Sequence, residues 1–313
     1  MTDTWKPTIA VIGAGAMGCL FGGLLSEGGL KVTLIDIWQA HVDTINRDGL
    51  RLIGYGGDRY VPITATVDPK NVKPVDVVLV QCKAAFTTEA IQNAKHIFRA
   101  DTVAISFQNG LGNEEIIGDV IGMEHVLGGV TAQGSSVAAP GAVRNYSDLP
   151  SQIGEMSGGI SERAKQIAAA FTAAGLQTTA SANIRFDIWK KLLANIALSP
   201  TCAVANLTIN QVMRHPELRE TAFNALDEAT IVAKAEGFEF DANETREVLM
   251  QIAGAGGTGD NKSSLCVDIL NKRPSEIDMI NGMIVELGKK HHIPTPVNKT
   301  LVAAVKGLES HYL

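Results

Sequence analysis

The sequence predicts an α/β fold, in which a doubly wound sheet is followed by an all-helical C-terminal part. In the first half of the chain, short apolar runs alternate with helical segments, a pattern typical of βαβ units around a parallel sheet. Beyond Ile184 nearly every segment has the period of a helix. The 313 residues leave room for two domains, which we place at 1–181 and 182–313.

The strands of the sheet are predicted from apolar runs that end in glycine or polar residues. The runs at 75–81 and 102–108 are almost continuously apolar, as expected for strands buried on both faces of a parallel sheet. A helix is expected from about Ala16, and an amphipathic helix over 40–48 should end at Gly49. The four strands predicted on this basis are 8–13, 31–36, 75–81 and 102–108.

The remainder of the chain changes character twice. The stretch 126–153 is rich in Gly, Ser and β-formers, which predicts further strands or an antiparallel edge. A helix over 162–175 with Gly175 as its C-cap precedes a short strand or linker. The glycine-rich segment 254–260 follows no strand, so it predicts a mobile loop and not a phosphate site. Helices are expected on both sides of this segment, at 186–199, 216–237, 242–253, 264–271 and 275–291.

Composition and charge argue against several classes of protein. The chain is 45% hydrophobic and 19% charged with a net charge of -6, which fits a folded protein without nucleic acid as its main partner. The opening MTDTWKP has Asp3 where a secretory signal would be positive, and no apolar stretch reaches the roughly 20 residues of a membrane span. The four cysteines are scattered. We therefore expect a cytoplasmic protein with reduced thiols and no membrane contact.

A glycine-rich turn follows the first strand. Gly13, Gly15 and Gly18 have G-x-G-x-x-G spacing, with Ala16 and Met17 between the last two. The first glycine permits a tight turn, the second lets a pyrophosphate approach the backbone, and the third lets helix and strand pack closely. Because the motif follows a strand and opens a helix, it predicts a Rossmann-type dinucleotide site at this turn. The alternative is a turn used only for packing.

The second strand ends in Asp36, which bears on the choice of cofactor. A carboxylate at this position accepts the two ribose hydroxyls of NAD, whereas a 2′-phosphate would meet like charge. At about 4 Å that repulsion is worth up to about 4 kcal/mol near a surface. Arg47 is too far along the following helix to offset it. The sequence thus favours NAD(H) over NADP(H), unless Asp36 turns away to cap the next segment.

Two adjacent lysines in the helical part lie on different faces. Helical neighbours are three or four residues apart, so Lys191, Asn195 and Ser199 form one polar stripe in an apolar setting, while Lys190 points about 100° away. Ligands of doubly wound sheets bind outside the carboxyl ends of the strands. Lys83 and Asn109 follow two such strands directly, so we expect them to face that crevice, with the polar stripe as the opposite wall.

Five motifs follow one another along the chain in a family-specific order. They are GAGAMG at 13–18, Cys82-Lys83, Gln108-Asn109-Gly110, the W-x-K-x-x-x-N of 189–195, and SEIDMING at 275–282. In this combination the chain resembles the ketopantoate reductase (2-dehydropantoate 2-reductase) family over its whole length. The resemblance implies an oxidoreductase of pantothenate biosynthesis that reduces a small 2-keto acid to a D-2-hydroxy acid with NAD(P)H.

The resemblance also implies roles for residues of the helical part. It makes Lys191 the general acid, which suits a lysine whose pKa is lowered by burial, and Glu276 its acidic partner near the substrate. Asn109 and Asn195 would hydrogen-bond the substrate, with Asn109 also near the nicotinamide ribose. The alternative for the acids around Ser275 is an N-cap with a charged first turn.

Three further positions are implied with alternatives that stay open. Ser264 matches the serine that binds the substrate carboxylate, although the sequence alone would make it a helix N-cap. Lys83 would attract that carboxylate or orient the cofactor, unless it is a surface lysine. Ser199 stands where many members of the family have a second asparagine. Ketopantoate is therefore the leading substrate by resemblance only.

Several alternatives concern the whole protein. NADP(H) is the cofactor of most of the family, and relatives with an acid at the position of Asp36 include NAD-dependent D-2-hydroxyacid dehydrogenases for branched or aromatic 2-keto acids. A β-hydroxyacid dehydrogenase would need a glycine-rich helix where FDIW stands, and a redox sensor without turnover would lack the polar site residues. His291-His292 predicts a helix end and no metal site. The oligomeric state stays open, with a homodimer among the options.

Overall fold

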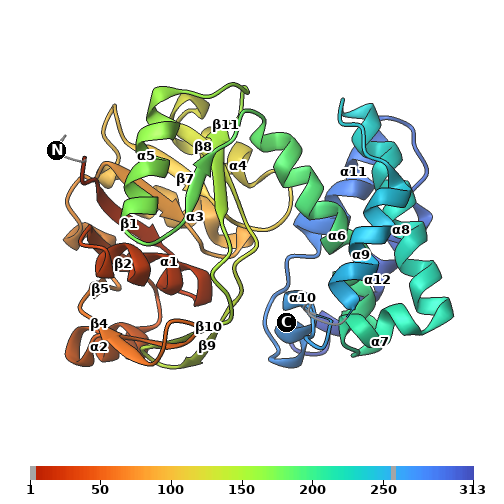
Figure 1. Cartoon of the computed structure of the whole chain (residues 1–313), viewed down its shortest axis with the longest axis horizontal. Helices are drawn as coiled ribbons and strands as arrows, with labels where there is room; N and C mark the ends of the chain where they lie inside the picture. Colours follow the sequence, from red (N-terminus) through yellow and green to blue (C-terminus); the bar gives the residue numbers. More distant parts are fainter. Residues whose placement is uncertain (1–4, 255–258) are drawn as a thin grey trace. The chain divides into compact units, whose positions relative to one another are not determined.

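A computed structural model describes residues 5–254 and 259–313 (Figure 1). It forms two compact units, Met1–Gln108 with Asn113–Asp187, and Asn109–Gly112 with Ile188–Leu313. The boundary predicted from the sequence lies at 181/182, and the grouping of Asn109–Gly112 with the helical unit is not apparent in the sequence. The assignment of each domain's role stays a prediction. The predictions for the first four residues and for most of the 254–260 segment lie outside the described residues.

The first unit is built on an eight-stranded sheet in the order β12-β11-β8-β7-β6-β1-β2-β5. In the sheet, the neighbouring strands β8, β7, β6, β1, β2 and β5 are all parallel, whereas β11 runs antiparallel to β8. This confirms the predicted doubly wound sheet and the antiparallel edge after residue 126. The strands are β1 Thr8–Ile12, β2 Lys31–Ile35, β5 Thr64–Thr66, β6 Val77–Val80, β7 Val103–Ser106, β8 Val126–Thr131, β11 Ser151–Glu155 and β12 Thr178–Ala180.

Helices cover both faces of this sheet because its strands alternate their side chains between two cores. Ile9 and Val11 of β1 pack with residues of α1 and α5, while Ala10 and Ile12 pack with residues of α3 and α4. The α-helices of this unit are α1 Ala16–Glu27, α2 Gln39–Asp48, α3 Thr87–Asn93, α4 Asn113–Ile121 and α5 Glu162–Ala173. Short 3-10 turns are η1 Pro69–Asn71, η2 Ala84–Phe86, η3 Lys95–Ile97 and η4 Met123–His125.

A second, four-stranded sheet in the order β4-β3-β10-β9 completes the first unit. The strands between residues 50 and 66 are not apparent in the sequence, because they are short and β3 and β5 pair with segments distant in the sequence. In particular, β3 pairs in parallel with β10, about ninety positions further along the chain. The strands are β3 Leu50–Gly54, β4 Arg59–Val61, β9 Ser135–Ala139 and β10 Ala142–Asn145.

In the described residues of the second unit the regular elements are all helices, as predicted, and from Ile188 onward the unit is drawn from green to blue in Figure 1. The predicted helix over 275–291 differs in form: a π-helix, η5 Asp278–Gly282, comes first and α11 Met283–Lys290 continues it. The other helices are α6 Ile184–Ala205, which begins in the first unit, α7 Ile209–Arg214, α8 Pro216–Ala235, α9 Ala242–Ala253, α10 Ser264–Leu270 and α12 Pro296–Glu309. Helix α6 continues through Pro200.

Candidate active site

The turn between β1 and α1 has the geometry that a dinucleotide requires. Gly13 has φ +94, and a Cβ there would lie 2.4 Å from the Cys82 nitrogen. A Cβ on Gly18 would lie 1.9 Å from the carbonyl oxygen of Gly13. A Cβ on Gly15 would meet nothing within 4 Å, so the backbone there borders open space. The three glycines therefore fit the turn, the close packing and the open approach that the motif needs.

The amino end of α1 can hold an anion. Gly15 is its N-cap, with Ala16 and Met17 as the first helical residues. The N–H groups of a first helical turn have no intrahelical partner and point outward from the helix end. Met17 packs beside the larger core of the first unit, and the Ser135 hydroxyl lies 3.0 Å from its sulfur. Backbone N–H groups and a firmly packed first turn are the parts that would hold a pyrophosphate.

Asp36 follows β2 at its carboxyl end and is half-buried. One of its carboxylate oxygens accepts the N–H of Trp38 at 2.9 Å. Helix α2 begins only at Gln39, and its N-cap makes no side-chain hydrogen bond, so Asp36 does not cap this helix. The side chain of Ile37 beside it is 95% exposed. Asp36 therefore bonds the turn that leads into α2, as the alternative expected in part, and its role toward a ribose stays a prediction.

Lys83 and Gln108 stand beyond the carboxyl ends of β6 and β7 in the first unit. The side chain amide of Gln108 donates to the carbonyl of Cys82 at 2.6 Å and to the Thr87 hydroxyl at 2.9 Å. These bonds hold the ends of two neighbouring strands together. Lys83 is half-buried at the N-cap of η2. It is therefore not a freely exposed surface lysine.

A polar triad of Lys191, Asn109 and Glu276 lies within the second unit. The Lys191 ammonium donates to Oδ1 of Asn109 at 2.9 Å, and Nδ2 of Asn109 donates to Oε2 of Glu276 at 3.1 Å. A lysine only donates and a carboxylate only accepts, so the two partners fix the orientation of the amide. The amide thus connects a cation on α6 to an anion just ahead of η5. The ammonium keeps further N–H groups that can reach a ligand.

The pKa of Lys191 lies below the ordinary value of a lysine. Burial lowers the pKa of Lys191 from its ordinary 10.5 to about 8, and the negative charge of Glu276 offsets part of this effect. Such an ammonium is charged at neutral pH but gives up its proton far more readily than an exposed lysine. The neighbouring Lys190 is exposed, so the two lysines do lie on different faces. Acid strength and position together allow Lys191 to protonate a developing alkoxide.

The rest of the polar stripe lies along α6. Asn195 and Ser199 follow Lys191 at four-residue spacing in an unbroken helix, so all three share a face. Asn195 is half-buried, whereas Ser199 is buried and its carbonyl accepts the Ser263 hydroxyl at 3.1 Å. The stripe predicted from the sequence is therefore present on one helix, with its last hydroxyl in the interior.

Helix α10 corrects one alternative for Ser264. The N-cap of α10 is Ser263, whose hydroxyl accepts the N–H of Cys266 at 3.2 Å, while Ser264 is the first helical residue and is exposed. The N-cap role proposed for Ser264 is therefore wrong by one position. The sequence NKSS offers two adjacent serines, and only the packing of Ser263 against α6 distinguishes them.

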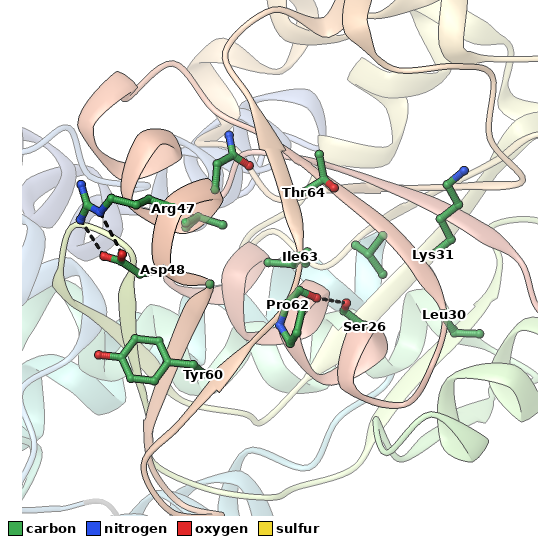
Figure 2. A pocket seen from close by; sticks show the side chains of 13 residues that line it. Ser26, Leu30, Lys31, Arg47, Asp48, Tyr60, Pro62, Ile63 and Thr64 are labelled. Atoms are coloured by element: carbon green, nitrogen blue, oxygen red, sulfur yellow. Dashed lines mark hydrogen bonds and ion pairs between the residues drawn. The ribbon is translucent and has the colours of Figure 1, made fainter.

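A surface hollow of about 620 Å³ lies elsewhere in the first unit (Figure 2). It is lined by Lys31 and Val32 at the amino end of β2, whereas Asp36 follows the opposite end of that strand. Its charged group Arg47 pairs with Asp48 at 2.6 Å, as Figure 2 shows. Within the first unit the hollow thus lies away from the carboxyl end of β2, and its Arg47 is already paired with Asp48.

Metal-binding clusters and membrane-spanning helices are both absent from the described parts of the two units. Residues 5–254 and 259–313 contain no group of three or more His, Cys, Asp or Glu side chains that could hold a metal ion. Over the same residues, no helix combines the length and the apolar character needed to cross a bilayer. His291 is the C-cap of α11, and its Nε2 contacts the Glu236 carboxylate, which fits the predicted helix end.

Comparison with known proteins places this arrangement in a family. A family model described as ketopantoate reductase PanE/ApbA matches residues 9–158, and the model of its C-terminal region matches residues 183–309. The chain belongs to this family. It is accordingly an oxidoreductase of the ketopantoate reductase type, and the resemblance inferred from its five motifs is confirmed.

Relatives cover nearly the whole chain. The chain is 33% identical to the 2-dehydropantoate 2-reductase of Pyrococcus abyssi over 302 residues, covering 96% of this chain and 98% of that protein. It is 34% identical to that of Archaeoglobus fulgidus over 304 residues, with the same coverage of 96% and 98%. The chain therefore aligns over nearly the full length of both relatives.

Solved structures of the same family align equally well. The ternary structure of D-mandelate dehydrogenase with NADH and anilino(oxo)acetate matches with a TM-score of 0.93 and 27% identity, covering 97% of this chain and 99% of that chain. A PanE/ApbA family ketopantoate reductase from Ralstonia eutropha matches with a TM-score of 0.89 and 30% identity, with coverage of 97% and 99%. The family therefore includes structures with more than one named substrate.

Proposed function

We propose that this protein reduces a 2-keto acid to a D-2-hydroxy acid with a reduced nicotinamide dinucleotide, and that Lys191 is the general acid. The observation that carries the proposal is the triad, in which a buried ammonium with a pKa of about 8 is oriented by Asn109 and Glu276. Membership of the ketopantoate reductase family supports the reaction class. Ketopantoate is the leading substrate, which would place the step in pantothenate biosynthesis.

The residues of the triad divide the work of proton transfer. The cofactor, when bound, supplies a hydride to the carbonyl carbon. Lys191 donates its proton to the carbonyl oxygen as negative charge develops there, and it is reprotonated from solvent after the product leaves. Asn109 accepts one ammonium N–H and so directs the others. Glu276 holds the Asn109 amide in place and favours the charged form of the lysine.

The cofactor would be held by the glycine-rich turn and by Asp36. Gly13 has the positive φ of the turn, Gly18 packs against the Gly13 carbonyl, and Gly15 leaves the open approach that a pyrophosphate would need. Asp36 would accept the ribose hydroxyls and disfavour a 2′-phosphate, so we propose NADH over NADPH. Support comes from the exposed apolar neighbour Ile37, which offers no cation for a phosphate, and from the aligned D-mandelate dehydrogenase, which was solved with NADH.

The substrate would be bound by polar groups on α6, α10 and the ends of the strands. We assign the substrate carboxylate to Ser264, with Asn195 one turn from Lys191 as a further hydrogen-bond donor. Lys83 would attract the same carboxylate or orient the cofactor. Ser199 is buried, and its carbonyl is bonded to Ser263, so its hydroxyl is a weaker candidate than the other groups.

A second candidate is an NAD-dependent D-2-hydroxyacid dehydrogenase that acts on branched or aromatic 2-keto acids. One observation favours it: the aligned structure of D-mandelate dehydrogenase contains anilino(oxo)acetate, an aromatic oxo acid by its name. The preference for NADH that we propose from Asp36 agrees with it. The same triad would serve this reaction in either direction. The side chain of the keto acid alone distinguishes the two candidates.

A cofactor-by-substrate matrix tests both candidates. Purified protein is assayed with NADH and NADPH against ketopantoate, 2-oxoisovalerate and phenylglyoxylate, following absorbance at the nicotinamide band. We expect turnover with NADH, and the substrate with the highest kcat/KM identifies the candidate. Cofactor binding without turnover on any of the three keto acids would contradict the proposal and would favour a nucleotide-binding redox sensor.

A further inference from the structure

Helix α6 contains a backbone carbonyl that the helix itself cannot satisfy. Pro200 lies within the helix and has no N–H, so the carbonyl of Ile196, four residues earlier, loses its usual intrahelical donor. Ile196 is fully buried, and a buried carbonyl without a partner is costly. The position is one turn beyond Lys191 and directly after Asn195. A donor from another element is therefore required close to the polar stripe.

Asn281 of the π-helix η5 supplies that donor. Its Nδ2 donates to the Ile196 carbonyl at 3.1 Å and to Oδ1 of Asn298 at 2.8 Å, and its side chain is fully buried. The Oδ1 of Asn281 has no hydrogen-bond partner within the described residues. A residue kept at this cost for stability alone is unusual, because buried polar atoms are nearly always paired.

The same π-helix also holds the loop that carries Asn109. The N–H of Leu111 donates to the carbonyl of Met279 at 2.9 Å. Gly110 has φ +97, and a Cβ on it would lie 2.2 Å from that carbonyl oxygen, so the loop lies directly against η5. Glu276 stands just ahead of η5, and its carbonyl accepts the N–H groups of Met279 and Ile280. The five-residue segment η5 thus contacts the helix that carries Lys191, the loop that carries Asn109 and the backbone of Glu276.

The other side of η5 is fixed by a network of polar contacts. Asn298 donates from Nδ2 to the carbonyl of Ala225 at 3.0 Å and to Glu228 at 2.7 Å. The Glu228 carboxylate in turn accepts the N–H groups of Val297 and Asn298, at the start of α12. Asn281 is therefore tied to α8 and α12 as well as to α6. It cannot shift along α6 without breaking these contacts.

We propose that Asn281 is a positioning residue. By bonding the Ile196 carbonyl, which lacks its helical donor because of Pro200, it fixes η5 against α6. It thereby sets where Glu276 and the Asn109 loop lie relative to Lys191. This inference rests on the proposed function for its kinetic test. π-helical segments inside helices often occur at functional sites, because the extra residue redirects side chains. Here the redirected side chain is the Asn281 amide, which donates to the Ile196 carbonyl of the helix that carries Lys191.

Four variants test the inference in the full-length protein. Asn281→Leu removes the amide and leaves a similar volume. Pro200→Ala returns an N–H to α6, which can bond the Ile196 carbonyl from within the helix. The double variant Pro200→Ala with Asn281→Leu satisfies the carbonyl without Asn281. The control Asn145→Leu removes a buried amide of the first unit. The Oδ1 of this amide accepts the N–H of Ser147.

The kinetic outcome separates positioning from simple stability. Asn281→Leu should lower kcat by about tenfold or more with little change in the KM for NADH, because the glycine-rich turn belongs to the other unit. The double variant should regain thermal stability but keep the low kcat. Pro200→Ala lets α6 itself satisfy the Ile196 carbonyl that Asn281 bonds, so its kcat should fall between the native value and that of Asn281→Leu. Asn145→Leu should stay within about threefold of the native kcat. Recovery of kcat together with stability in the double variant would overturn the inference, as would a native kcat in Asn281→Leu.

A measurement without turnover keeps the two proposals distinguishable. The pH dependence of Lys191 acetylation, read by mass spectrometry with Lys190 as internal reference, reports the ionisation of the lysine. In Asn281→Leu the midpoint for Lys191 should fall, because Glu276 is held less closely, whereas Asn145→Leu should leave it unchanged. If the native protein turns over no 2-keto acid but this midpoint still moves, the proposed function fails and the positioning role stands. An unchanged midpoint contradicts the positioning role.

Discussion

The ionisation of Lys191 predicts how the reaction depends on pH. Burial lowers the pKa of this lysine from 10.5 to about 8, with Glu276 opposing the change. One pH unit corresponds to about 1.4 kcal/mol, so the site disfavours the charged form by about 3 kcal/mol relative to water. With a pKa of about 8, roughly nine-tenths of the ammonium is protonated at pH 7 and roughly one-tenth at pH 9.

The perturbation is Lys191→Ala, compared with Lys190→Ala as the matched control. A general acid must be protonated to act in reduction, so native kcat/KM should be highest near pH 7 and fall through a midpoint of about 8. In oxidation of the hydroxy acid, the neutral amine accepts the proton and the rate should rise through the same midpoint. Lys191→Ala should lose about 10²–10⁴-fold in kcat/KM and the break near pH 8. The exposed Lys190→Ala should keep most of the activity.

The assay is NADH oxidation with the best keto acid, in buffers from pH 6 to pH 10 at constant ionic strength. NADH affinity, measured separately by fluorescence, should be similar in both variants because the glycine-rich turn is intact. Equal losses in the two variants would refute the assignment of the acid to this face of α6. A native profile that stays flat from pH 7 to pH 10 would refute the role of a lysine with a lowered pKa.

Three further predictions concern the surroundings of this lysine and the cofactor. Glu276→Gln removes a charge that raises the pKa of Lys191, so the midpoint of the kcat/KM profile should move to lower pH; a midpoint at higher pH would contradict this. Gly110→Ala places a Cβ 2.2 Å from a backbone oxygen at φ +97, so thermal unfolding should show a loss of stability of about 1–3 kcal/mol, and kcat should fall with it. Asp36→Ser combined with Ile37→Arg should shift the ratio of kcat/KM values toward NADPH, whereas a native preference for NADPH would exclude the role given to Asp36.

The fold class follows from local patterns in the sequence. Continuous apolar runs and helical runs of period 3.6 residues are properties of neighbouring residues, so the strands β1, β2, β6 and β7 and the helices of the second unit could be predicted. The second sheet could not, because β3 and β4 are short and β3 depends on pairing with β10. Likewise Ser263 and Ser264 are equivalent in sequence, and only packing against α6 makes the first of them the cap.

The same distinction applies to the candidate site. The sequence by itself determined that Lys191 and Lys190 point apart, because helical geometry fixes that angle, and that the glycines at 13, 15 and 18 form an open turn. Only the tertiary structure decided that Asn109 joins Lys191 to Glu276, residues separated from it by 82 and 167 positions. It also decided that Asn281 donates a hydrogen bond to the Ile196 carbonyl, which lacks a helical donor because of Pro200. Such contacts depend on how whole elements pack, and no local period in the chain encodes them.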